Sequence, residues 1–124
     1  MARVVVLIPD LLSGSRVQAS LAAAGHEVEL VGDPAGLAGR LADVEVLVVD
    51  LTNDDLDGPA LVEALSAEGV LAQMRTLGFY AHVDASMRER AERAGFDLVV
   101  PRSRMAREGA DLVTRLAADV RHPA

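Results

Sequence analysis

The chain has 124 residues, 51% of them hydrophobic and 25% charged, which suits one folded domain and excludes wholesale disorder. A net charge of -7 and only three aromatic residues, one tyrosine and two phenylalanines, argue against a nucleic-acid partner. A phosphate backbone would be repelled, and bases would find no stacking platform. With no cysteine, disulfides, thiolate metal sites and cysteine nucleophiles are excluded. We expect a single domain over residues 1–124.

No apolar run approaches the roughly 20 residues of a membrane span, and the N-terminal run lacks the length and cleavage site of a signal peptide. We therefore expect a cytoplasmic protein with no membrane partner. All twelve basic residues are arginines, which excludes Schiff-base chemistry and a lysine at a phosphate.

Short β-branched runs alternate along the chain with alanine-rich stretches of helical period. In chain order, the apolar runs predict strands at residues 4–8, 26–31, 44–49, 76–81 and 97–100. The stretches between and after them predict five helices. The first ends at Gly25 and the last at about Arg121.

Capping residues indicate where these helices begin. The expected starts are Ser13, Asp33 followed by Pro34, Gly58 with Pro59, Asp84 and Ser103. In the second helix Leu37 and Leu41 would face inward, although Gly36 and Gly39 weaken it.

Five strands alternating with five helices predict a doubly wound α/β domain, because right-handed crossovers place helices on both faces of a parallel sheet. We expect a flavodoxin-like five-stranded sheet of order 2-1-3-4-5, with the most hydrophobic strand, the third, at its centre. The first and fifth helices should cover one face. The carboxyl ends of the strands, where such folds place their sites, carry Asp10, Asp50, Thr52, Tyr80, Ala81, His82 and Arg102.

Asp50 ends the third strand, and Asp57 and Gly58 follow it seven and eight residues later. This spacing, together with residues 24–28 and 94–102, resembles the receiver domains of two-component response regulators over the whole chain. The resemblance implies a CheY-like fold and makes Asp50 the equivalent of the phosphoacceptor. It also implies a protein partner that binds the fourth helix, fifth strand and fifth helix.

The departures from the receiver pattern fall on its chemistry. Ile8 and Pro9 stand where receivers hold Mg²⁺ with an acidic pair, so we expect neither a metal site nor another cofactor. Tyr80 replaces the threonine or serine that contacts the phosphoryl group, and its ring is expected to fill that space. Arg102 replaces a lysine and is expected to pair with Asp50.

Three functions follow from this pattern. The first is a stand-alone pseudo-receiver that signals through protein contacts without magnesium-dependent phosphorylation. Such a domain is not an enzyme, and it could form a homodimer. The second is a phosphorylatable single-domain response regulator that uses Asp50, with Mg²⁺ held around Asp10. The third is a small-ligand binder whose strand-end crevice is built from Tyr80, His82 and Arg102.

Overall fold

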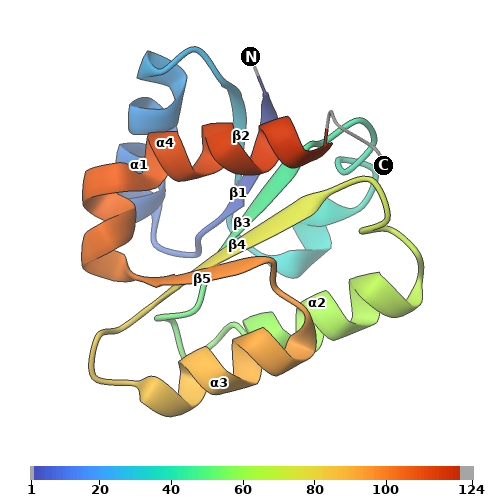
Figure 1. The fold of residues 1–124 in the computed structure, drawn as a ribbon, viewed down its shortest axis with the longest axis vertical. Helices are drawn as coiled ribbons and strands as arrows, with labels where there is room; N and C mark the ends of the chain where they lie inside the picture. The colour runs from blue at the N-terminus through green and yellow to red at the C-terminus, as the bar shows by residue number, and fades with distance from the viewer. Residues whose placement is uncertain (1, 121–124) are drawn as a thin grey trace.

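A five-stranded parallel sheet forms the centre of the computed structural model, which describes residues 2–120 (Figure 1). Its strands are β1 (Arg3–Leu7), β2 (Glu27–Val31), β3 (Val46–Asp50), β4 (Arg75–Tyr80) and β5 (Leu98–Pro101). The helices are α1 (Leu11–Ala23), α2 (Gly58–Ala67), α3 (Ala85–Ala94) and α4 (Arg102–Val120), with one 3-10 turn, η1 (Pro34–Leu37). Arg121, the expected end of the last helix, lies outside the described residues. Within residues 2–120, no helix has both the length and the apolar character needed to cross a membrane.

The strand order is β2-β1-β3-β4-β5, so the predicted flavodoxin-like, doubly wound topology is confirmed. β3 lies at the centre, as its hydrophobicity predicted, and all five of its residues are buried. In the parallel register Leu7 pairs with Val49, and Asp50 pairs with Phe79. The third strand therefore ends beside β4 at the carboxyl edge of the sheet.

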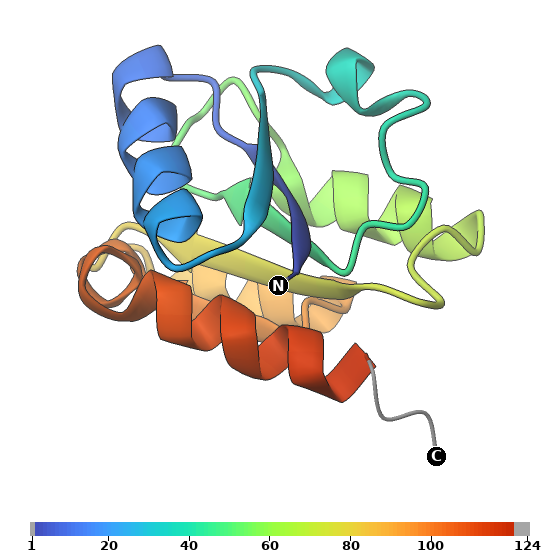
Figure 2. The ribbon, with the colours of Figure 1, turned by 90° about the horizontal axis from the view of Figure 1, so that it is seen from above.

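Helices cover both faces of the sheet, and each face has its own apolar cluster. On the first face α1 and α4 lie side by side (Figures 1 and 2) and cover Val48, Leu77 and Phe79. On the opposite face lie η1, α2 and α3, over a cluster that includes Val49 and Tyr80. We call these the α1/α4 face and the α2/α3 face. The predicted placement of the first and last helices on one face is confirmed.

The predicted second helix is wrong beyond its first turn. Asp33 caps it as expected, accepting a hydrogen bond from the Gly36 N–H at 2.9 Å, but only the single turn η1 forms. The helical path ends at Ala38, whose ψ of 123° is extended, and Gly39 follows with a left-handed φ of 74°. Asp43 has a φ of 63°, rare outside glycine, and turns the chain into β3.

Two helix starts differ from their predicted positions. Asp10 rather than Ser13 caps α1, which begins at Leu11, and α4 begins at Arg102, directly after β5 and before Ser103. The expected cap at Asp84 is confirmed by its bond from the Met87 N–H at 3.1 Å.

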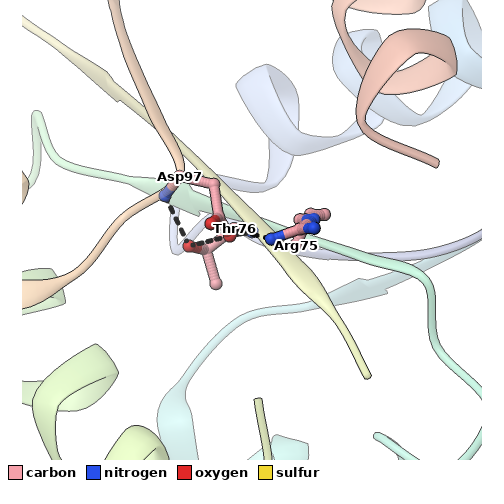
Figure 3. Close-up of polar contacts among 3 residues, drawn as sticks. All are labelled: Arg75, Thr76 and Asp97. Atoms are coloured by element: carbon pink, nitrogen blue, oxygen red, sulfur yellow. Dashed lines mark hydrogen bonds and ion pairs between the residues drawn. The ribbon is translucent and has the colours of Figure 1, made fainter. Parts of the chain in front are cut away.

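A polar cluster fastens β4 to β5 at the amino edge of the sheet (Figure 3). The Asp97 carboxylate accepts hydrogen bonds from the Thr76 N–H at 2.8 Å and the Thr76 hydroxyl at 3.2 Å. The same hydroxyl accepts a bond from the Asp97 N–H at 3.0 Å, and Arg75 lies 3.4 Å from the carboxylate. Because Thr76 is buried, these bonds hold the strands in register at the edge opposite Asp50.

Candidate functional site

Asp50 is a buried carboxylate at the carboxyl end of β3, only 4% exposed. Its Oδ1 accepts two hydrogen bonds from Thr52, from the backbone N–H at 2.7 Å and from the hydroxyl at 2.6 Å. Its Oδ2 accepts no hydrogen bond from residues 2–120. Within these residues, every side-chain oxygen or nitrogen that is fully shielded from solvent has a hydrogen-bond partner. Oδ2 therefore keeps contact with solvent.

Strand alternation fixes the direction in which Asp50 points. Val49 and Leu51, on either side of it, both belong to the cluster on the α2/α3 face. Since successive side chains of a strand point to opposite faces, Asp50 points to the α1/α4 face. Its register partner Phe79 lies on that same face, as does Ile8 at the end of β1. The surroundings of the Asp50 carboxylate are thus largely apolar.

Asp10 is occupied as a helix cap rather than presented as a ligand. Its Oδ2 accepts hydrogen bonds from the Ser13 hydroxyl at 2.6 Å and the Ser13 N–H at 3.3 Å. These bonds, with a smaller contribution from the Arg16 charge, hold the pKa of Asp10 below its ordinary value.

The strand ends do not fit the magnesium site that the receiver resemblance implies. β1 runs into Ile8 and Pro9, which offer no side-chain oxygen, and the Asp10 carboxylate is bonded to Ser13. In the described part of the chain, no three histidine, aspartate or glutamate side chains gather in a way that could hold a metal ion. A hard cation that needs six oxygen ligands would find one buried carboxylate, Asp50.

The expected ion pair between Arg102 and Asp50 does not form. Of the ion pairs and hydrogen bonds within residues 2–120, none joins these two side chains. Arg102 is the first residue of α4, and its side chain lines a cavity between α4 and α1 instead. An exposed arginine is free to turn along its helix, so its position after β5 does not determine its partner.

The expectation that the Tyr80 ring fills the space of a phosphoryl group on Asp50 is also wrong. Tyr80 packs in the cluster on the α2/α3 face, whereas Asp50 points to the α1/α4 face. Phe79, one residue earlier, is the β4 side chain that shares a face with Asp50.

Of the three remaining residues predicted for the pocket, one contacts the Asp50 carboxylate and two do not. Thr52 bonds to Asp50 directly. The Ala81 carbonyl accepts a bond from the Asp84 N–H at 2.8 Å in the turn before α3, and His82 is exposed. Of the six residues expected around Asp50, the structure brings only Thr52 to its carboxylate.

Sequence reasoning missed the cavity between α1 and α4. It has a volume of about 260 Å³ and opens beside Phe79, on the face to which Asp50 points. Its α1 lining lies at positions 13, 17 and 20, and its α4 lining at positions 102, 105 and 109. Each set of three positions has the spacing of one helical face. The cavity could have been predicted from sequence by noting that these two faces, on the first and last helices, lie opposite each other.

Several solved structures with a similar fold are receiver domains. The signal receiver domain of a histidine kinase from Syntrophus aciditrophicus matches with a TM-score of 0.85 and 17% identity, covering 100% of this chain and 96% of that one. A response regulator receiver domain from Clostridium thermocellum matches with a TM-score of 0.84 and 14% identity, covering 98% of each chain. The Francisella response regulator 1452 receiver domain gives 0.82 and 16%, covering 96% of this chain and 98% of its own. The chain has the receiver fold. No protein-family model and no curated protein matches it in sequence.

Within this receiver fold the Asp57–Gly58 pair has a structural role. The Asp57 carboxylate caps α2 by accepting a bond from the Ala60 N–H at 3.1 Å, and it pairs with Arg90 of α3 at 3.2 Å. Gly58 leaves room for Leu51, because a Cβ at position 58 would lie 2.5 Å from a Leu51 methyl carbon. In this chain both residues of the pair therefore have a role in helix capping or packing.

Proposed function

We propose that this receiver-like domain acts in signal transduction by contact with a protein partner, and that Asp50 does not undergo magnesium-dependent phosphorylation. On this proposal the domain holds no resident metal and has no catalytic activity of its own. The receiver fold supports the signalling part, since the neighbours named above are receivers of response regulators and of a histidine kinase.

One observation carries the second part: Asp10 is tied to Ser13, and Ile8 and Pro9 leave no other acid at the end of β1. Attack by a carboxylate on a phosphoryl donor brings negative charges together, and bound cations normally neutralise them. Arg102, the cation that directly follows β5, lines the α1/α4 cavity and makes no ion pair with Asp50.

The proposed contact surface is formed by α3, β5 and α4. The exposed side of α3 is strongly charged, with Arg88 paired to Glu92 at 3.8 Å and Arg93 also exposed. A photo-crosslinker at Arg93 should give a specific protein adduct in cells that persists in Asp50→Asn. The matched control places the crosslinker at Glu63, exposed on α2, where no such adduct is expected.

Phosphorylation is tested by intact-mass analysis after incubation with acetyl phosphate and Mg²⁺. We expect an unmodified mass, and no rise in melting temperature with Mg²⁺ and beryllofluoride. Pro9→Asp adds a carboxylate at the half-buried end of β1 and should introduce a Mg²⁺-dependent rise in melting temperature, whereas its uncharged control Pro9→Asn should not.

A specific observation keeps a phosphorylatable response regulator as the second candidate. Oδ2 of Asp50 keeps contact with solvent and has no protein partner within residues 2–120, so a phosphoryl donor could reach it. A phosphoryl adduct on the wild-type protein that disappears in Asp50→Asn would establish this candidate and overturn our proposal.

A further inference from the structure

The cavity between α1 and α4 combines an apolar floor with two arginines at its mouth. Leu21, Phe79 and Met105 form part of the floor, and each of them is buried in the cluster on the α1/α4 face. Arg16 on α1 and Arg102 on α4 line the same cavity, and both residues are exposed. The cavity therefore has one apolar end and one cationic end.

Small residues on the two helices keep this space open. Ser20 lines it from α1, and Gly109 lines it from α4. A Cβ at Gly109 would lie 3.0 Å from the Met105 methyl carbon, so a larger residue there would push Met105 into the cavity.

Neither arginine has its charge satisfied within the described residues. Arg16 and Arg102 make no ion pair or hydrogen bond with residues 2–120, and Asp10 attracts Arg16 only at longer range. Six other arginines each pair with a carboxylate: Arg40, Arg75, Arg88, Arg90, Arg104 and Arg107. Arg3, Arg93 and Arg115 make no ion pair within residues 2–120 either, but they do not line this cavity. In a chain of net charge -7, two unpaired guanidinium groups facing one apolar cavity form a local site for an anion.

We propose that this cavity binds a small organic carboxylate with an apolar body. Its carboxylate would lie between Arg16 and Arg102 and accept a bond from the Ser20 hydroxyl, which has no partner among the described residues. Its apolar body would pack on Phe79 and Met105. The volume of about 260 Å³ lies just below the range of about 300–1,000 Å³ typical of drug-sized ligands, so a body of one ring fits and a dinucleotide does not.

This site is separate from the Asp50 carboxylate and does not depend on the function proposed above. Arg102 begins α4 directly after β5, within the proposed contact surface. An occupant that holds Arg102 at the cavity would thus alter the end of that surface without any phosphoryl group.

Phenylacetate is the probe, titrated by calorimetry and by NMR of methionine methyl groups. We expect binding that shifts the Met105 methyl signal, while Met74 and Met87, which pack on the α2/α3 face, serve as internal controls. Phenylacetamide, the neutral isostere, and acetate, which lacks the ring, should each bind at least about tenfold more weakly.

Variants assign the binding to this cavity. Arg16→Gln and Arg102→Gln should each weaken phenylacetate binding about tenfold, and Ser20→Leu should abolish it by filling the space. Arg107→Gln is the matched control, because Arg107 lies on α4, does not line the cavity and pairs with Glu108 at 3.7 Å.

Three results would overturn the proposal. The first is the absence of any Met105 shift at millimolar phenylacetate. The second is equal affinity for phenylacetate and phenylacetamide, which needs no variant and so does not depend on folding of the substituted proteins. The third is self-association that Ser20→Leu abolishes in sedimentation analysis, since a second copy of the chain would then cover the cavity.

Discussion

Thr52 donates both of its hydrogen-bonding groups to a single oxygen of Asp50, at 2.7 Å and 2.6 Å. The carboxylate is thereby fixed at the end of β3 by its own chain two residues later, without a cation. Two bonds to an ionised acceptor in a buried position should contribute measurably to folding stability.

Asp50→Ala should lower the free energy of unfolding by about 1 to 3 kcal/mol, because it leaves the Thr52 N–H and hydroxyl without their charged acceptor. Asp50→Asn keeps an oxygen for these donors and should cost less. Urea denaturation at neutral pH measures both differences.

Thr52→Val is the matched control, since it removes one of the two bonds and leaves the carboxylate in place. In a double-mutant cycle, Asp50→Ala and Thr52→Val should couple by about 0.5 kcal/mol or more. A melting temperature that rises on removing Asp50 would instead show that repulsion between carboxylates governs this edge, as in a magnesium-binding receiver.

The cap at Asp10 makes the stability of α1 depend on pH. Hydrogen bonds from Ser13 lower the pKa of Asp10 below its ordinary value of 3.8, so the folded state favours the ionised carboxylate. The stabilisation should be fully present above that value and should be lost as the pH falls through the lower pKa of the folded protein.

Thermal denaturation across an acid series of wild type and Asp10→Ala measures this effect. The variant should melt at a lower temperature at neutral pH, and the gap should narrow below pH 3.8. Asp10→Asn keeps the cap without the charge and should melt nearer the wild type. A gap that stays constant at every pH would contradict a role for the ionised carboxylate.

The bonds between Thr76 and Asp97 should contribute more than the ion pair that accompanies them. Thr76 is 1% exposed, so Asp97→Ala leaves a buried N–H and hydroxyl without their acceptor and should cost about 1 to 3 kcal/mol. Arg75→Gln removes only a half-exposed pair at 3.4 Å and should cost about 0 to 1 kcal/mol. Equal losses in denaturant unfolding would show that the charge pair, not the buried bonds, fastens β5.

The sheet could be predicted from sequence because burial on both faces demands continuous apolar runs. β3 has this property over its whole length, and its position at the centre of the sheet follows from it. The second helix could not be predicted with the same success. Its cap, Asp33, is strong, but the chain leaves the helical region at Ala38 after one turn and continues through Gly39 with a left-handed φ, and sequence alone does not give these backbone angles.

The candidate site was predicted less well than the fold, because it depends on where side chains turn. Asp50 and Thr52 are two residues apart, so their contact is local and sequence placed them together. Arg102 is distant from Asp50 in the sequence and comes to the same edge of the sheet only in the folded chain. Its long side chain lines the α1/α4 cavity and does not bond to Asp50. Tyr80 lies on the opposite face from Asp50, because Asp50 pairs with Phe79 in the sheet and Tyr80 is the next residue along β4.

Gly58 should resist enlargement because Leu51 is confined on both sides. A Cβ at Gly58 would lie 2.5 Å from one Leu51 methyl carbon, and a Cβ at Gly78 would lie 2.7 Å from the other. Alanine favours a helix over glycine by up to about 1 kcal/mol, whereas overpacking a buried cluster costs about 1 to 3 kcal/mol, so Gly58→Ala should destabilise the fold by about 1 kcal/mol. In a Leu51→Ala background only the milder approach to Val49, at 3.1 Å, remains, and the same substitution should cost less or become neutral in urea denaturation. Stabilisation by Gly58→Ala in the wild-type background would mean that Leu51 moves aside freely and that glycine at this position has no packing role.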